Sequence, residues 1–226
     1  MFDNLIIAHR GIHNNIDIPE NSIASFNKAI KNKLPIELDI RKTKDDALVV
    51  FHDKTLKRLA NFNKNIENMS INEIKKLKLL STEEHIPTLK EVLNLVNGKV
   101  LIDIEVKNCK SWKKICKILI SDLSKYKYPY IIKSFNPKII KYIKKLDKNI
   151  IVGLLIKNDI YNKKVGNLIL KYYNPNFLAI SKKIINKSGI KKHLLKYNII
   201  IWTISSKEEM NKYKNITTNY ICNISI

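Results

Sequence analysis

Carboxylates alternate with aliphatic side chains in residues 36–41. Glu37 and Asp39 are two positions apart, so a β-strand would place both acids on one face and the aliphatic side chains on the other. Residues 100–107 repeat this pattern around Glu105. Buried acids need a neutralising cation, and an all-oxygen set suits a hard ion better than zinc. Glu37, Asp39 and Glu105 are therefore predicted to bind one divalent cation, Mg²⁺, Ca²⁺ or Mn²⁺.

Two histidines lie at the ends of predicted strands beside these acids. His9 directly follows the first strand, and His52 ends the strand that follows the first acidic one. Near neutral pH, a pair of histidines can share general-acid and general-base catalysis. Arg10 offers a fixed fork of donors for phosphate oxygens, and Lys107 offers a point charge. Together with a divalent cation, these residue types favour phosphodiester chemistry over proton abstraction or aldol chemistry.

Four further side chains extend the predicted pocket. Trp202 ends an aliphatic strand, where it could fill the core or form a wall against the substrate, and we favour the wall. Ser134 and Phe135 have a similar place at the end of another strand, whereas His13 could line the pocket mouth or lie on a loop surface. Lys107 could also serve only as a salt-bridge partner of the neighbouring glutamate.

Eight strand-like segments alternate with helix-like segments along the chain. This order predicts an α/β fold of the TIM (β/α)8 barrel type, in which active-site residues lie at the carboxyl ends of the strands. A doubly wound sheet is the alternative, but no glycine-rich phosphate loop follows the first strand. The predicted barrel strands are residues 5–8, 36–41, 100–106, 130–134, 150–155, 177–180, 199–203 and 219–222.

The second barrel strand is predicted to continue into a β-hairpin on the active face. Residues 42–47 alone separate it from the next strand, whereas a parallel crossover needs a dozen residues or more. With its turn near Asp45 and Asp46, the hairpin would return His52 to a position roughly opposite Asp39.

Capping residues and apolar spacing predict where the helices begin. The predicted caps are Asn21 or Ser22, Ser70 with Glu73, Thr88 with Glu91, Pro137 in a first turn, and Ser206 with Glu209. Towards the C-terminus, the apolar spacing predicts helices near residues 160–172 and 187–197.

Length and composition predict one globular domain over residues 1–226, with 45% hydrophobic residues. No stretch reaches the roughly 18 apolar residues of a membrane span, and no leader pattern opens the chain, so a cytoplasmic protein is expected. We expect a monomer or a homodimer. The net charge of +22 is compatible with peripheral contact with an anionic membrane. Because the lysines are spread along nearly every segment and no reader motif is present, no specific nucleic-acid partner is expected.

The sequence resembles the glycerophosphodiester phosphodiesterase family over essentially its whole length. The matching stretches are His9-Arg10-Gly11, Pro19-Glu20-Asn21-Ser22, Glu37-Leu38-Asp39-Ile40, Thr43-Lys44-Asp45, residues 48–53, Thr55-Leu56 with Arg58, Ile86-Pro87-Thr88-Leu89, Glu105-Val106-Lys107, Ser134-Phe135 and Trp202-Thr203. The resemblance implies a TIM barrel that hydrolyses glycerophosphodiesters, such as glycerophosphocholine or glycerophosphoethanolamine, to sn-glycerol 3-phosphate and an alcohol.

The same resemblance implies roles for individual residues. His9 and His52 would be the acid/base pair, and Trp202 would lie against the glycerol moiety. Metal binding would fall to Glu37, Asp39 and Glu105, and phosphate binding to Arg10 and Lys107. In related enzymes a neighbouring substrate hydroxyl is thought to attack first and give a cyclic phosphate, which is a hypothesis here.

Two positions depart from the family pattern. Asp46 stands where the family usually has Gly at the hairpin turn, and Cys222-Asn223 aligns with the family's closing Thr-Asp. Two other functions remain open at this point. One is a lysophospholipase D-type phosphodiesterase, which would need an apolar groove beside the site, and the other is a catalytically idle basic binding protein on the same barrel.

Overall fold

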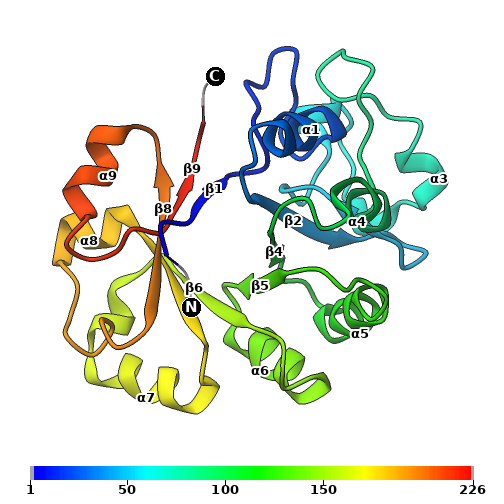
Figure 1. The fold of residues 1–226 in the computed structure, drawn as a ribbon. Helices are drawn as coiled ribbons and strands as arrows, with labels where there is room; N and C mark the ends of the chain where they lie inside the picture. Colours follow the sequence, from blue (N-terminus) through cyan, green and yellow to red (C-terminus); the bar gives the residue numbers. More distant parts are fainter. Residues whose placement is uncertain (1–2, 225–226) are drawn as a thin grey trace.

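Eight parallel strands close into a barrel in the computed structural model, which describes residues 3–224 apart from the side chains of residues 160 and 162. The strand order β1-β9-β8-β7-β6-β5-β4-β2 is closed by pairing of β1 with β2, and Figure 1 shows β1 beside β9. The strands are β1 (Ile6–Ala8), β2 (Ile36–Lys42), β4 (Ile102–Val106), β5 (Tyr130–Ser134), β6 (Val152–Ile156), β7 (Phe177–Ser181), β8 (Asn198–Ile204) and β9 (Tyr220–Cys222). The predicted TIM-type barrel is confirmed.

The predicted hairpin is also present. Strand β3 (Leu48–Val50) pairs antiparallel with the end of β2, and the Phe51 N–H donates to the Asp39 carbonyl at 2.8 Å. Asp46 in the turn has a φ of +69°, a left-handed conformation that Asp adopts more readily than most residues. The hairpin therefore brings the chain after β3 back beside the acidic strand without a glycine at this position.

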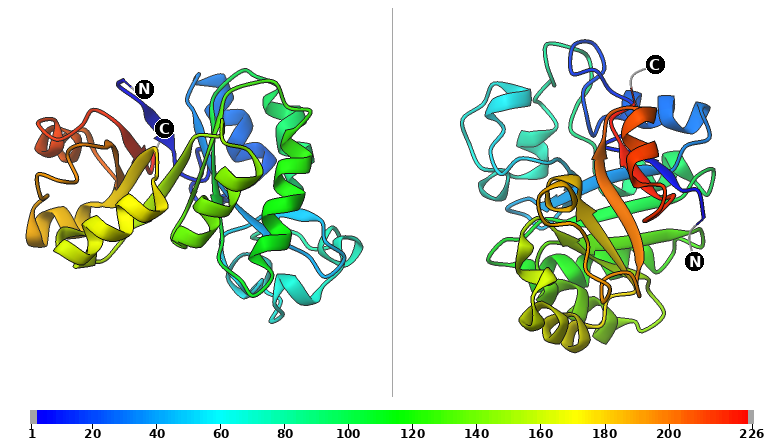
Figure 2. Two further views of the ribbon diagram at one scale, coloured as in Figure 1. Left: turned by 90° about the horizontal axis from the view of Figure 1, so that it is seen from below. Right: turned by 90° about the vertical axis from the view of Figure 1, so that its left-hand side faces the viewer.

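Helices cover the outside of the strands (Figures 1 and 2). They are α1 (Ile23–Lys31), α2 (Lys57–Ala60), α3 (Ile71–Ile74), α4 (Leu89–Val96), α5 (Trp112–Leu123), α6 (Pro137–Leu146), α7 (Lys164–Tyr173), α8 (Lys182–Ser188) and α9 (Lys207–Tyr213), with 3-10 turns η1 (Ile66–Asn68) and η2 (Asp159–Asn162). In the described part of the chain, no helix has the length and apolar character needed to cross a membrane.

The helix caps follow the sequence signals closely. Capping boxes begin α3 and α4 as predicted, and the Ser206 hydroxyl caps α9. Of the two candidates for α1, Ser22 is the N-cap, because its hydroxyl accepts the Ser25 N–H. Asn21 instead donates its side-chain amide to Oδ2 of Asp39 at 2.9 Å, which makes it part of the acidic cluster described below.

One predicted helix is misplaced. The helix expected near residues 187–197 lies at residues 182–188, directly after β7, and turns follow it. Gly189 has a φ of +64° and donates its N–H to the Ile185 carbonyl, so it ends the helix as a C-terminal cap. The apolar Leu194 beyond it is buried from a turn, which explains why apolar spacing alone suggested a helix there.

The barrel interior has an apolar side and a charged side. An apolar cluster fills it from β1, β5, β6, β7, β8 and β9, and Phe177 is its largest fully buried side chain. A β-carbon at Gly153 would approach the Phe177 ring to 2.2 Å, so this position needs glycine. Strands β2, β4 and β5 instead contribute buried acids and lysines. The charged side is where the candidate site lies.

Candidate active site

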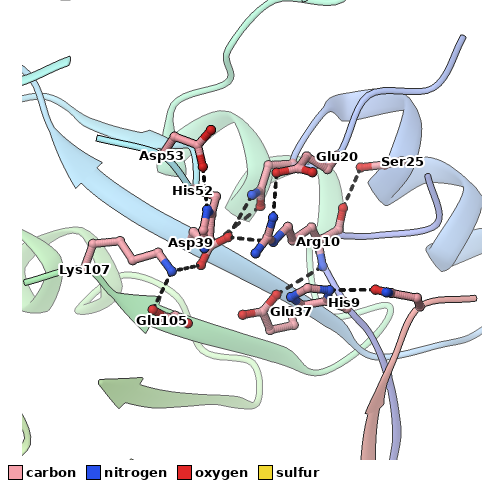
Figure 3. A network of polar contacts seen from close by, with 12 residues as sticks. His9, Arg10, Glu20, Ser25, Glu37, Asp39, His52, Asp53, Glu105 and Lys107 are labelled. Carbon is pink, nitrogen blue, oxygen red and sulfur yellow. Dashed lines mark hydrogen bonds and ion pairs between the residues drawn. The ribbon is translucent and has the colours of Figure 1, made fainter. Parts of the chain in front are cut away.

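Three carboxylates cluster where β2 and β4 lie side by side. Glu37 and Asp39 come from β2, and the parallel register pairs Asp39 with Glu105 of β4. Each side chain offers an oxygen within 4.8 Å of the other two, and none is more than 6% exposed. The structure therefore brings together the three acids that strand alternation placed on common faces (Figure 3).

Lys107 and Arg10 lie against these acids. The Lys107 ammonium is 2.7 Å from Oδ1 of Asp39 and 2.5 Å from Oε1 of Glu105. Arg10 donates its backbone N–H to Oε2 of Glu37 at 3.1 Å, and its Nε lies 3.3 Å from Oδ2 of Asp39. Burial by itself would raise the pKa of Asp39, but Lys107 and Arg10 hold it well below its usual range. Asp39 is therefore anionic at neutral pH.

The loop that carries Arg10 has a left-handed backbone. Arg10 and Gly11 have φ values of +56° and +78°, and a β-carbon at Gly11 would approach Oγ of Ser25 to 2.5 Å. The Arg10 carbonyl accepts hydrogen bonds from the Asn21 N–H at 3.0 Å and the Ser25 hydroxyl at 3.1 Å. Such backbone at a non-glycine residue is unfavourable alone, so these contacts hold the loop that directs the Arg10 N–H at Glu37.

Lys133 and Asp103 form a buried ion pair below the cluster, and the sequence reasoning assigned a role to neither. The Lys133 ammonium lies 2.5 Å from Oδ2 of Asp103 and 3.2 Å from Oε1 of Glu37. Burial lowers the pKa of Lys133, but Asp103 and Glu37 outweigh it and raise the pKa above its ordinary value. In the sequence, Lys133 could have been noticed as the single lysine in the otherwise uncharged strand Tyr130–Ser134.

Replacing Lys133 by methionine is expected to destabilise the fold, because it leaves the fully buried Asp103 without a cation. Removing one partner of a buried ion pair typically costs about 3–5 kcal/mol, and urea unfolding would measure this loss. Lys133→Met combined with Asp103→Asn removes the uncompensated charge and should recover much of the stability. A single variant as stable as the original protein would show that Lys133 does not neutralise Asp103.

The acid cluster is suited to a divalent cation. Burial raises the pKa of Glu105 to about 7, and Lys107 offsets this only in part. Because burial and the neighbouring Asp39 and Glu37 carboxylates disfavour the ionised form of Glu105, a bound cation would stabilise that form. The donor atoms are all carboxylate oxygens, which Mg²⁺, Ca²⁺ and Mn²⁺ prefer. The residues present therefore fit a hard metal ion.

His9 and His52 each use Nδ1 to contact an oxygen and line the same cavity. Nδ1 of His9 lies 2.7 Å from Oδ1 of Asn223, and Nδ1 of His52 lies 2.7 Å from Oδ1 of Asp53. Because both oxygens accept, each Nδ1 carries the hydrogen and each neutral ring has its lone pair on Nε2. Burial lowers the pKa of His52, although Asp39 opposes the shift.

A chain of ion pairs connects His52 to Arg10 behind the site. Arg58 donates from Nε to Asp53 at 2.7 Å and from NH2 to Glu20 at 2.6 Å, and Arg10 donates from NH1 to Glu20 at 2.7 Å. Burial would raise the pKa of Glu20, but Arg58 and Arg10 lower it to about 2. Glu20, Asp53 and Arg58 belong to the family-like stretches but had no predicted role. They hold His52 and Arg10 in place, and Figure 3 shows the contacts of Asp53 with His52 and of Glu20 with Arg10.

These side chains surround a cavity of about 260 Å³ at the carboxyl ends of the strands. Its charged wall faces an aromatic wall formed by Phe135 and Trp202. These two rings pack edge to face, with their centroids 5.6 Å apart. The Trp202 indole donates to the Ala179 carbonyl at 2.8 Å, which fixes the ring. The cavity is lined by His9, Arg10, Glu37, His52, Glu105, Lys107, Lys133, Phe135, Leu155, Lys157, Trp202, Thr203 and Ile221.

Two of the predicted pocket residues are not among those that line this cavity. The buried Ser134 hydroxyl donates to the Val106 carbonyl at 2.8 Å and accepts the Asn136 N–H, so it joins β5 to β4. Both ring nitrogens of His13 are buried and have no hydrogen-bond partner among the described residues, and burial lowers its pKa. A hollow of about 400 Å³ on the outside, between α4 and α5, is lined by Lys90, Asp122 and Lys125 among others, with no histidine among its described residues.

Comparison with known proteins gives consistent relatives. The model of the "Glycerophosphoryl diester phosphodiesterase family" matches residues 9–221. A glycerophosphodiester phosphodiesterase of Caldanaerobacter subterraneus subsp. tengcongensis is 34% identical over an alignment that covers 92% of this chain and 88% of that protein.

Two solved structures have the same fold. An Oleispira antarctica phosphodiesterase in complex with the product sn-glycerol-3-phosphate has a TM-score of 0.83 at 22% identity, covering 97% of this chain and 92% of that one. A glycerophosphodiester phosphodiesterase of Thermotoga maritima has a TM-score of 0.80 at 24% identity, covering 99% of this chain and 96% of that one. At these identities the likeness shows the shared barrel.

Proposed function

Because this chain belongs to the glycerophosphoryl diester phosphodiesterase family, we propose that it hydrolyses glycerophosphodiesters, such as glycerophosphocholine and glycerophosphoethanolamine, to sn-glycerol 3-phosphate and an alcohol. The observation that carries this proposal is the cavity itself, where a cluster of buried acids meets two histidines. Each histidine contacts a neighbouring oxygen through Nδ1, which leaves Nε2 for the substrate. The test is release of glycerol 3-phosphate from glycerophosphocholine by the purified protein. No release from any of several head groups, with a folded protein and added Mg²⁺, Ca²⁺ or Mn²⁺, would contradict it.

In this proposal Glu37, Asp39 and Glu105 hold one divalent cation, Mg²⁺, Ca²⁺ or Mn²⁺. When bound, such an ion polarises a phosphoryl oxygen and offsets the charge that develops there. Arg10 and Lys107 bind the phosphate and orient it. The glycerol moiety lies against Trp202, whose ring is fixed by its hydrogen bond to Ala179.

The two histidines divide the proton transfers. The lowered pKa of His52 leaves its Nε2 unprotonated at neutral pH, so it accepts the proton of the attacking hydroxyl. His9 acts in its protonated form, in which Nε2 also carries a hydrogen, and donates that proton to the leaving alkoxide. The attacking group is either water or the neighbouring hydroxyl of the substrate, and phosphorus NMR during turnover distinguishes them, because only the second gives a cyclic phosphate. If no cyclic species forms under single-turnover conditions, direct attack by water is favoured.

The replacement of the family's aspartate by Asn223 leads to a pH prediction. Asn223→Asp would place a carboxylate against Nδ1 of His9 and stabilise the protonated ring. An opposite charge this close typically changes a pKa by about 1–3. A proton donor remains active until it loses its proton, so the alkaline limb of kcat/KM should move to higher pH. Asn223→Ala, which removes the contact without adding charge, is the control. An unmoved limb in Asn223→Asp would argue against His9 as the donor.

The cavity also bears on the alternative substrates. A lysophospholipase D-type reaction would need an apolar groove for an acyl chain, but the groove that adjoins the cavity is lined mainly by lysine, asparagine and aromatic residues. We further propose that the chain acts as one domain in the cytoplasm, as a monomer or homodimer. Size-exclusion chromatography with light scattering tests the oligomeric part, and a higher oligomer would contradict it.

A further inference from the structure

The aromatic wall of the cavity carries a lysine of its own. Phe135 and Trp202 could together bind a quaternary ammonium group, since aromatic faces attract such cations. However, the Lys157 ammonium lies 4.8 Å from the centroid of the Phe135 ring, and Lys157 also lines the cavity. The protein's own cation therefore occupies the place that a choline head group would use at this ring.

A second hollow begins on the other side of Phe135. This open groove of about 610 Å³ lies beyond the carboxyl ends of β4 and β5, and Phe135 is the residue it shares with the cavity. It is lined by Asn108, Cys109, Lys110, Trp112, Phe135, Asn136, Pro137 and Lys138. A substrate that extends past Phe135 from the cavity would enter this groove.

The charges along this path have one sign. Lys110 and Lys138 in the groove and Lys157 at its entrance are all exposed. In the part of the chain that the structure describes, none of the three makes an ion pair, and no acidic residue lines the groove. By contrast, the two buried lysines of the cavity, Lys107 and Lys133, are both paired with carboxylates. The groove thus presents positive charge that no protein group among the described residues neutralises.

We infer that this groove is a subsite for the alcohol moiety of the substrate and that it selects alcohols carrying a further phosphate group. The inference rests on the proposed function, because the phosphodiester must be held at His9 and His52 for its alcohol to pass Phe135. Phosphate oxygens would meet the three ammonium groups and the Asn108 and Asn136 amides. A choline or ethanolamine moiety would meet the same positive charges and be disfavoured.

The test compares glycerophosphocholine with glycerophosphoglycerol that carries a terminal phosphate. We expect kcat/KM at low ionic strength to be at least ~10-fold higher for the phosphorylated substrate, because three exposed ammonium groups would act together on the added phosphate. In the variant Lys110→Gln/Lys138→Gln/Lys157→Gln, the ratio of the two values should fall towards one. The matched control, Lys117→Gln/Lys145→Gln/Lys192→Gln, loses the same net charge from exposed positions outside both hollows and should keep the ratio.

The outcomes separate the two proposals. If neither substrate is hydrolysed, the proposed function fails. If both are hydrolysed at similar rates by the original protein, or if the groove variant keeps the preference, the subsite is overturned while the phosphodiesterase assignment stands. If the control variant loses the preference as well, the overall charge of +22, rather than the groove, is responsible, and the subsite is again overturned.

Discussion

Replacing His52 by alanine is expected to lower kcat by about 10²–10⁴-fold, the usual contribution of one general acid or base. His9→Ala should have an effect of similar size. The variants should remain folded, because Asp53 keeps its ion pair with Arg58 when the His52 ring is removed. Steady-state release of glycerol 3-phosphate measures the loss, and thermal unfolding tests the fold.

A matched control is available in His85. Its Nδ1 contacts the Leu77 carbonyl at 3.0 Å, and it does not line the cavity, so His85→Gln should keep nearly full activity. The original protein should also lose activity towards acid pH, as His52 becomes protonated. Since burial lowers the pKa of His52 from 6.5, this acid limb should lie below pH 6.5. A His9 or His52 variant that works at the original rate would overturn the assignment of the pair.

The second large effect is expected from loss of the metal ligands. EDTA should abolish activity, and added divalent cation should restore it. Glu37→Ala and the near-isosteric Glu37→Gln should both remove activity together with its dependence on metal. Mutating a residue that only supports a metal ligand typically lowers activity by about 10–100-fold. The loss of activity in the Glu37 variants should be larger, because a direct ligand is removed.

Metal binding can be measured independently of catalysis. An ion that binds only the folded protein adds about 2.7 kcal/mol of stability at a free concentration of 100 times Kd, so Mn²⁺ should raise the Tm of the original protein. Glu37→Gln should lose this shift, whereas Glu208→Gln, at an exposed position of α9, should keep it. Equal thermal shifts in the two variants would show that Glu37 does not bind the ion.

Much of the fold could be predicted because its signals are local. Alternation of acids and aliphatics identified β2 and β4, and the short connection of residues 42–47 required the antiparallel hairpin. Capping boxes placed the starts of α3 and α4. The prediction failed for residues 187–197, where burial of Leu194 from a turn imitates helical spacing and a positive φ at Gly189 ends the helix early. Apolar spacing reports burial, and burial occurs in turns as well as in helices.

The sequence by itself determined the barrel and the types of chemical groups at the ends of its strands. It grouped Glu37 with Asp39 and indicated Glu105, because a period of two fixes which side chains share a strand face. Only the tertiary structure decided which charges meet across strands. Lys133 reaches Asp103 from 30 positions away, and Asn223 reaches His9 from 214 positions away. Such contacts depend on the order and closure of the strands, which no local spacing encodes.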